Sequence, residues 1–431
     1  MTDLSKVLPT KSATVEAIES YWKKRGTSEK PRKYLGASSI GAECSRQLWY
    51  NFRHCSAPNF DGRLYRLFDR GHREEATFVE ELRGIGCDVH EFDNDGNQFE
   101  VIACDGHFKG HTDGAALGVP EAPKTWHLLE MKTASAKSFT KTKRDGVEKD
   151  KPQHFAQMQV YMHLTGLKRA LYMVVNKDND ELYTERLKHD SKRAQSYIDK
   201  AQMIIDASTP PERISDKPDS WACKFCDAKE LCHGTSEDIA VPVSALSCRN
   251  CVYSTASQDG KWICDKTGNE AKAVCDNHLF IPALVGFAEP TDSLENKDGS
   301  AVIEFTSDDS TVWHHGNDRD AGQFSSHDLI TLPRDLVTLP NAKKKEALHN
   351  LEARYSTALD NVESIWRGPI DNVRDEFEKR YNVPMSNPDA TQDGDSWTAA
   401  EFRPHCCVIV YGNKAEIRED KNTITTQIVC I

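Results

Sequence analysis

The sequence predicts an α/β protein, with a mixed sheet flanked by helices, in a chain of more than one domain. Two observations predict this fold class. Apolar residues alternate with a period of two in several short runs, and between these runs they recur at the spacing of amphipathic helices. The chain of 431 residues also exceeds the roughly 250 to 300 residues that one hydrophobic core supports. We therefore expect two or three domains.

The helices and strands of the first 240 residues follow from these patterns. A helix is expected over 66–84, where an apolar face ends at a glycine. Pro152 predicts the start of a second helix, which Gly166 ends, and a polar-faced helix is expected over 191–207. Strands are expected at 87–92, 98–103, 106–116, 125–132, 169–176 and 182–187.

Proline-containing and turn-rich segments mark the domain boundaries. They predict a first domain at 1–240, a Cys-rich module at 241–289 and an acidic α+β region at 290–431. In the last region, "GSAVIEFTSDDSTVWHH" predicts a small hairpin. Helical spacing of apolar residues over 342–381 predicts two consecutive helices, with Gly368 and Pro369 between them.

Composition limits the class of protein. No apolar run approaches the roughly 18 residues of a membrane span, and "MTDLSKVLPTKSATVEAIES" lacks the basic and apolar regions of a secretory signal. We expect a cytoplasmic protein without a membrane partner. In a reducing compartment, clustered cysteines are more often metal ligands than disulfides. Eight of the 14 cysteines are clustered; buried free thiols are expected at Cys55, Cys87, Cys104, Cys406, Cys407 and Cys430.

The net charge of −12 is unevenly distributed. From residue 289 onward there are 26 acidic and 15 basic residues, whereas the first 288 residues hold 41 acidic and 40 basic ones. The segment 124–151 carries eight Lys or Arg against four acids, an excess that could meet phosphates or belong to a solvated loop. A nucleic-acid partner is therefore compatible with the first domain, and a protein partner with the acidic region.

The most informative chemistry lies in "GHTDGAALGVPEAPKTWHLLEMKTA". Two strands joined by a turn would place Asp113 beside Glu130, since antiparallel neighbours lie about 5 Å apart. Two such carboxylates can hold a hard divalent cation, Mg²⁺ or Mn²⁺, which activates water and stabilises charge on a phosphodiester. The period of two puts Lys132 on the same face as Glu130, where it can orient or deprotonate the nucleophile. A surface salt bridge is the alternative.

These residues resemble the PD-(D/E)XK nuclease motif. "GHTDG" and "LLEMKTA" stand where its RecB-type branch carries Gly-x-x-Asp-Gly and acid-x-Lys-Thr strands. The resemblance implies a restriction-endonuclease-like core. It also implies that the upstream helix "RLFDRGHREEATFVEEL" brings a further metal-facing side chain, His72 or Glu75. The downstream pair Gln157-x-x-x-Tyr161 matches the branch's Q-x-x-x-Y pattern and would contact the scissile strand.

The resemblance extends to a thiolate site. Iron-sulfur nucleases of this branch, of the AddB and CRISPR-associated types, carry one cysteine before the core and Cys-x2-Cys-x5-Cys after it. Here Cys223, Cys226 and Cys232 have that spacing, and Cys44 in "GASSIGAECSRQLWYNF" matches the upstream cysteine, with Cys55 the alternative. Four thiolates can hold zinc as readily as iron. It is the resemblance that implies a [4Fe-4S] cluster, which would join the two ends of the domain.

A second cysteine set follows at once. Cys248-x2-Cys251 is followed by Cys264, and Cys275 or His278 completes the set. Two ligand pairs separated by a short hairpin are typical of a structural Zn²⁺ site.

Together these features predict a metal-dependent DNA exonuclease, or a nuclease acting on ends and single strands, in recombination or end processing in a phage or bacterium. A CRISPR-adaptation nuclease is one alternative. A non-catalytic protein on a nuclease scaffold, binding DNA or another protein, is another.

Overall fold

The structure is a computed structural model that describes residues 12–28, 31–236, 238–318 and 320–339, and the backbone of four strands beyond them. The chain divides into two compact units, Met1–Leu339 and Pro340–Ile431. The first unit contains the ranges expected for the nuclease domain and the Cys-rich module, and the start of the acidic region. The division into three domains stays a prediction.

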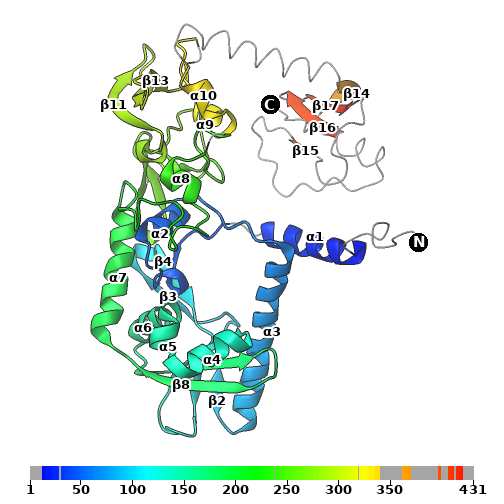
Figure 1. Ribbon diagram of the computed structural model, residues 1–431, viewed down its shortest axis with the longest axis vertical. Coiled ribbons are helices and arrows are strands. Elements are labelled where there is room, and N and C mark those ends of the chain that lie inside the picture. The colour runs from blue at the N-terminus through cyan, green and yellow to red at the C-terminus, as the bar shows by residue number, and fades with distance from the viewer. Residues whose placement is uncertain are drawn as a thin grey trace, which may run out of the picture. The chain divides into compact units, whose positions relative to one another are not determined.

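The described helices all belong to the first unit (Figure 1). They are α1 (Ala13–Thr27), α2 (Ser45–Phe52), α3 (Gly62–Gly84), α4 (Ala136–Asp145), α5 (Val147–Asp150), α6 (Pro152–Thr165), α7 (Ser191–Asp206), α8 (Lys229–His233), α9 (Ser326–Thr331) and α10 (Arg334–Val337). None of these helices is both long and apolar enough to cross a membrane.

A five-stranded mixed sheet organises the fold, and its strand order is β2-β5-β6-β7-β8. The strands are β2 (Asp88–His90), β5 (Ala115–Leu117), β6 (His127–Ala134), β7 (Arg169–Asn176) and β8 (Leu182–Lys188). Strands β6 and β7 are parallel, and the other neighbours are antiparallel. The predicted α/β class is confirmed.

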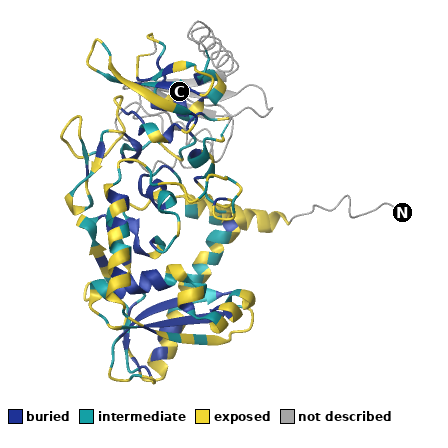
Figure 2. Cartoon of the chain, turned by 60° about the vertical axis from the view of Figure 1, so that its left-hand side comes forward, coloured by how far each residue is buried: buried dark blue, intermediate teal, exposed yellow. Residues whose placement is uncertain are grey.

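The core of this sheet lies under α3. Phe78, Val79 and Leu82 pack on apolar residues of β5, β6 and β7, including Leu129 and Met131. Each such side chain contributes roughly 1.5–3 kcal/mol by burial. Strand β6 is almost continuously buried, as expected for a strand with helices on both faces. Buried residues fill the sheet and the helix faces that cover it (Figure 2). The core therefore holds β6, the strand that carries Glu130 and Lys132, in a fixed place.

The strand predicted over 106–116 is in fact two strands in different sheets. Strand β4 (Phe108–His111) lies between β1 (Leu35–Gly36) and β3 (Glu100–Ala103), whereas β5 joins the large sheet. The chain turns between them at Gly114, whose φ of +123° is a conformation that side-chain-bearing residues rarely adopt. The period of two continues through this turn, so the sequence pattern could not reveal that the strand is divided.

The part of the basic segment 124–151 that follows the expected strand was interpreted as a loop, but it contains two helices, α4 and α5. Phe139 and Thr142 are buried and anchor α4, which ends at Gly146 with a φ of +76°. Many of its charges are paired. Lys141 and Lys151 contact Asp150 at 2.7 and 3.1 Å. Pairing with acids reduces the charge that this segment offers to phosphates.

Three small sheets complete the description. Strands β9 (Ser254–Ala256) and β10 (Trp262–Cys264) form a hairpin in the Cys-rich module. The hairpin predicted after residue 298 is confirmed as β12 (Ala301–Ser307) and β13 (Val312–His315), with β11 (Ala288–Glu295) beside β12. The second unit holds a four-stranded sheet in the order β14-β17-β16-β15, made of β14 (Val362–Pro369), β15 (Trp397–Thr398), β16 (Cys406–Tyr411) and β17 (Lys414–Asp420).

The prediction of two helices over 342–381 is wrong at 362–369, where the chain is the strand β14. This strand pairs with β17 through a bulge between Ser364 and Trp366. Apolar spacing in "VESIWRGP" fits either period over so short a run, and the tertiary pairing decides between them. The rest of that range lies outside the described residues.

Candidate active site

Asp113 and Glu130 lie side by side, as the sequence predicts. The register pairs Ala115 with Leu128, and Asp113 in the preceding turn accepts a hydrogen bond at 2.8 Å from the backbone N–H of Met131. Glu130 and Lys132 lie on the same face of β6, with Lys132 Nζ 2.6 Å from Glu130 Oε1. The same Nζ lies 3.7 Å from Asp113 Oδ2. Two carboxylates and one ammonium thus form a single cluster.

Burial gives this cluster unusual electrostatics. Glu130 is fully buried, and loss of hydration raises its pKa to about 7, although the nearby Lys132 charge opposes that shift. Burial acts against the charge on Lys132, but Glu130 and Asp113 outweigh it and raise the pKa of the ammonium. Glu130 Oε1 is engaged by the Lys132 ammonium at 2.6 Å, and a divalent cation would share this carboxylate with it. Carboxylate oxygens are the donors that Mg²⁺ and Mn²⁺ prefer.

The two glycines of "GHTDG" have physical roles. A Cβ on Gly110 would lie 2.4 Å from the hydroxyl of Tyr161, and one on Gly114 would lie 2.5 Å from the carbonyl oxygen of His90. Both distances are far below van der Waals contact. The first glycine lets the α6 tyrosine pack against β4, and the second lets the chain turn so that Asp113 reaches β6.

Helix α3 adds a third carboxylate. Burial raises the pKa of Glu75, the charge of Asp113 raises it further, and Lys132 and His72 lower it. Glu75 is partly buried, whereas His72, one turn earlier, is exposed. Of the two candidates that the sequence offers, Glu75 is the one whose carboxylate acts on the cluster.

Gln157 and Tyr161 lie on one face of α6, as their spacing predicts, and both are buried. Gln157 Nε2 donates to Glu130 Oε2 at 2.9 Å. Burial raises the pKa of Tyr161, and Glu130 and Asp113 raise it further. Gln157 therefore orients the carboxylate in this structure; contact with a DNA strand stays a prediction.

Two side chains near Lys132 were missed at the sequence level. Tyr172 pairs in register with Glu130, and its hydroxyl lies 3.1 Å from His154 Nδ1. Burial, then the charges of Lys132 and Lys151, lower the pKa of His154 to about 3. A neutral His154 thus faces the ammonium. The parallel pairing of β6 with β7 brings Tyr172 here, and the packing of α6 brings His154; local periodicity carries no signal for either.

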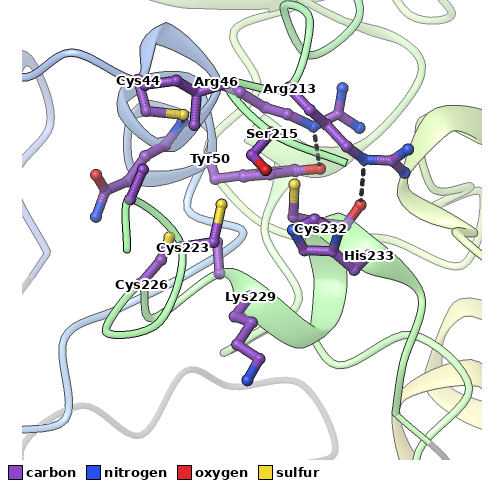
Figure 3. A pocket seen from close by; sticks show the side chains of 14 residues that line it. Cys44, Arg46, Tyr50, Arg213, Ser215, Cys223, Cys226, Lys229, Cys232 and His233 are labelled. Carbon is purple, nitrogen blue, oxygen red and sulfur yellow. Dashed lines mark hydrogen bonds between the residues drawn. The ribbon is translucent and has the colours of Figure 1, made fainter. Parts of the chain in front are cut away.

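Four cysteines predicted to act together line a single pocket: Cys44, Cys223, Cys226 and Cys232. Figure 3 shows their sulfur atoms around that pocket, one from the start of α2 and the others from the segment that ends in α8. Cys44 caps α2, since its sulfur accepts a hydrogen bond from Gln47 N at 3.4 Å. Cys55, the alternative upstream cysteine, is not among the residues that line the pocket.

Two arginines hold this pocket together. Arg46 donates from Nε to the hydroxyl of Tyr50 at 2.9 Å and from a terminal nitrogen to the Pro211 carbonyl at 2.8 Å. Arg213 Nε donates to the Cys232 carbonyl at 2.9 Å. Figure 3 shows this hydrogen bond and the one between Arg46 and Tyr50 as dashed lines. The arginine of the Cys-x-Arg segment, Arg46, therefore ties the start of α2 to Pro211.

The second cysteine set also converges. Burial raises the pKa of Cys248 to about 11, and the thiols of Cys251, Cys275 and Cys264 raise it further. His278 is excluded from this set because its two ring nitrogens lie 2.7 Å from Ser326 Oγ and 3.1 Å from the Ser247 carbonyl. Cys275 is the fourth member of this group of thiols.

Neither set of four cysteines has the geometry of a metal site in this structure. Among the residues that the structure describes, no three His, Cys, Asp or Glu side chains are already arranged to hold one metal ion. The donor types fit zinc or iron, but cluster and zinc stay predictions. Of the six other cysteines, Cys55 and Cys87 are buried as expected, and Cys104 is only partly buried; the side chains of Cys406, Cys407 and Cys430 lie outside the described residues.

Comparisons with known proteins give no family. No protein-family model matches the chain, and no curated protein matches its sequence. Solved structures match weakly. A protein designated SSO0001 has 14% identity and a TM-score of 0.33, over 51% of this chain and 96% of its own.

Two exonuclease structures are among the other matches. An alkaline exonuclease from Laribacter hongkongensis has 16% identity and a TM-score of 0.30, over 43% of this chain and 90% of its own. A phage-related exonuclease from Haemophilus somnus 129PT has 16% identity and a TM-score of 0.24, over 32% and 69%. Likeness at this level does not define what this chain does.

Proposed function

We propose that the chain is a metal-dependent nuclease that hydrolyses phosphodiester bonds of DNA at ends or in single strands. The observation that carries the proposal is the cluster of Asp113, Glu130 and Lys132, with Nζ 2.6 and 3.7 Å from the two carboxylates. Two acids and a lysine on adjacent backbone segments are the groups that phosphodiester hydrolysis with a divalent cation requires.

Asp113 and Glu130, with Glu75 beside them, would hold Mg²⁺ or Mn²⁺. Such a cation, when bound, lowers the pKa of water and neutralises charge on the phosphate. Lys132 stays protonated because its neighbours raise its pKa, so its role is to supply positive charge to the phosphate rather than to take a proton. Gln157 keeps the Glu130 carboxylate in one orientation through its 2.9 Å hydrogen bond.

A cleavage assay tests this function. Purified protein should degrade labelled linear DNA with Mg²⁺ or Mn²⁺ and not in EDTA. Asp113→Ala and Lys132→Ala should each abolish cleavage while circular dichroism shows a native fold. Unchanged cleavage by both variants would refute the assignment, and absence of cleavage by the wild type would favour the non-catalytic alternative.

The thiol pocket of Cys44, Cys223, Cys226 and Cys232 would hold a [4Fe-4S] cluster with a structural role. Its support is the set of four thiols around one pocket together with the resemblance in cysteine spacing. Cys248, Cys251, Cys264 and Cys275 would hold Zn²⁺. Anaerobically purified protein should be brown and contain about four irons and one zinc per chain, since a [4Fe-4S] cluster on the first four thiolates contains four irons and the second four hold one zinc. Colourless protein with two zincs and no iron would exclude the cluster.

The acidic region from residue 290 would bind a protein partner or limit indiscriminate DNA binding, as its excess of acidic residues suggests. A variant with the exposed acids Asp292, Glu295, Asp298 and Asp309 changed to their amides tests this idea, because residues 289–339 carry 11 acidic against 3 basic residues. It should increase binding to nonspecific DNA at low salt, and unchanged binding would remove the second role.

A further inference from the structure

A second cavity lies away from all the residues discussed so far. It has a volume of about 310 Å³ and is lined by the end of α2, the end of α7, strand β9 and the segment at 281–282. Figure 1 shows α2 beside the last turn of α7, where Trp49 Nε1 donates to the Ala207 carbonyl at 2.8 Å. Its floor includes the buried residues Arg53 and Ser254. The volume is at the lower end of the range of small-molecule sites.

One buried arginine, Arg53, lies in this floor, and it donates at 3.2 Å to the carbonyl of a second, Arg249, which lies outside the lining. Arg53 and Arg249 are 4% and 7% exposed, and their guanidinium groups lie 4.7 and 4.9 Å from the ring centre of Trp262. Among the described residues neither forms an ion pair with a carboxylate. Burial lowers the pKa of each to about 10, so both remain charged at neutral pH.

Backbone carbonyls satisfy these arginines only in part. Arg53 donates to the carbonyls of Ser254 at 2.8 Å and of Ala207 and Arg249 at 3.2 Å. Arg249 donates to those of Phe52 at 3.1 Å and Lys33 at 2.5 Å. Against the larger effect of burial, the carboxylate of Asp265 raises the pKa of Arg53 but makes no ion pair with it. Carbonyl dipoles do not neutralise a full charge, and a buried charge without a counter-charge is costly. An anion in the adjoining cavity would offset that cost.

Two polar atoms at the floor have no partner. Arg53 Nε and Ser254 Oγ are both buried without a hydrogen bond, and both residues line the cavity. An unpaired buried donor costs about 1–3 kcal/mol, and an acceptor that reached these atoms from the cavity would remove that cost. The exposed hydroxyls of Ser208 and Thr209 line the same cavity.

We propose that this cavity binds the phosphate of a free nucleoside monophosphate. The phosphate would face Arg53 and Ser254, and Ile281 and Val252 would contact the sugar or base. The carboxylate of Asp206 is also in the lining and repels any phosphate, so it is the cavity volume of about 310 Å³ that favours a small ligand over a DNA strand. The phosphate assignment stands on the lining alone; the choice of a nucleotide rests on the proposed nuclease function, whose product could be such a molecule.

Titration calorimetry with the full chain in EDTA tests the proposal, because no cleavage occurs there and its result is independent of nuclease activity. The probes are dAMP, deoxyadenosine, inorganic phosphate and a short 5′-phosphorylated oligonucleotide. An Asp113→Asn background removes any contribution from the acidic cluster. We expect dAMP to bind more tightly than phosphate, and deoxyadenosine not to bind.

Two variants at the cavity and one control make the test specific. Ser208→Glu at the exposed rim should weaken dAMP binding roughly fivefold, and Ser254→Ala should weaken it roughly tenfold. Ser196→Glu adds the same charge to an exposed position of α7, 12 residues earlier, and should change nothing. Unfolding temperatures establish that each variant is folded.

Four outcomes would overturn the assignment. These are no binding of dAMP at millimolar concentration, equal affinity for dAMP and inorganic phosphate, tighter binding of the oligonucleotide through the same cavity, and binding that neither cavity variant changes. A cleavage assay that fails while dAMP binding responds to Ser208→Glu would refute the nuclease and leave the phosphate site.

Discussion

The acidic cluster and the thiol pocket are assembled in different ways. Asp113, Glu130 and Lys132 lie within 20 residues of one another, and the register of β5 with β6 alone brings them together. The thiol pocket joins Cys44 to Cys232, which lie 188 positions apart, through side-chain contacts of Arg46 and Arg213. The first arrangement depends on one pair of strands, and the second depends on the tertiary fold.

This difference separates chemistry from stability. The cluster keeps two carboxylates and an ammonium close together at the expense of hydration, as the raised pKa of Glu130 indicates. Such strain is common at sites that act on substrates. The pocket instead ties the α2 segment to the chain that follows α7. Variants in the cluster should therefore change activity, and variants in the pocket should change stability.

The largest expected effect is that one substitution nearly abolishes activity while another lowers stability. Glu130→Gln should reduce DNA cleavage roughly a thousandfold, since it removes a charged ligand from the site, and should lower the unfolding temperature at pH 7 less than Cys226→Ser does. Cys226→Ser should lower the unfolding temperature but keep cleavage per folded molecule within about tenfold. Cleavage rates and calorimetric scans on the same preparations measure both. A folded Cys226→Ser protein without activity would contradict the separation.

The next effect concerns Gly110, which links the cluster to α6. Gly110→Ala should destabilise the protein by roughly 1–3 kcal/mol, because its Cβ would lie 2.4 Å from the Tyr161 hydroxyl and overpacking costs about that much. Urea unfolding measures it. Gly84→Ala is the matched control, since nothing lies within 4 Å of its Cβ. Tyr161→Phe should recover part of the loss in a Gly110→Ala background; a purely additive double variant would show that this contact is not the cause.

The sequence predicted the cluster better than its surroundings. Asp113 and Glu130 were located because strand pairing is local, and the four thiols of the pocket because their spacing matched a known pattern. The sequence could not predict that the chain passes from one sheet to another at Gly114, since the alternation of buried and exposed residues continues through the turn. Nor could the sequence reveal Tyr172 and His154, because the parallel pairing of β6 with β7 and the packing of α6 bring them toward Lys132. The strand β14 shows the same limit, because its apolar spacing fits two periods.

A smaller effect is the part of the pH dependence of stability that comes from Glu130. The pKa of Glu130 rises from 4.5 when unfolded to about 7 in the folded protein. The folded state therefore holds this proton more tightly, and its stabilising contribution is complete below pH 4.5 and lost as pH rises through about 7. The loss is at most a few kcal/mol. The difference in unfolding free energy between wild type and Glu130→Gln, measured in EDTA at pH 5 and pH 8, isolates it. A constant difference would contradict the raised pKa.

The smallest expected effect tests how the pocket is held. Arg46→Lys keeps the positive charge but loses the geometry by which Nε reaches Tyr50 while a terminal nitrogen reaches Pro211. Loss of these two partly buried hydrogen bonds should cost roughly 1–2 kcal/mol. Arg144→Lys is the control, because this arginine pairs with its neighbour Asp145 at an exposed position. If Arg46→Lys unfolds no earlier than Arg144→Lys, the arginine does not hold the pocket, and the chain between α7 and α8 must be fixed by the cysteines themselves.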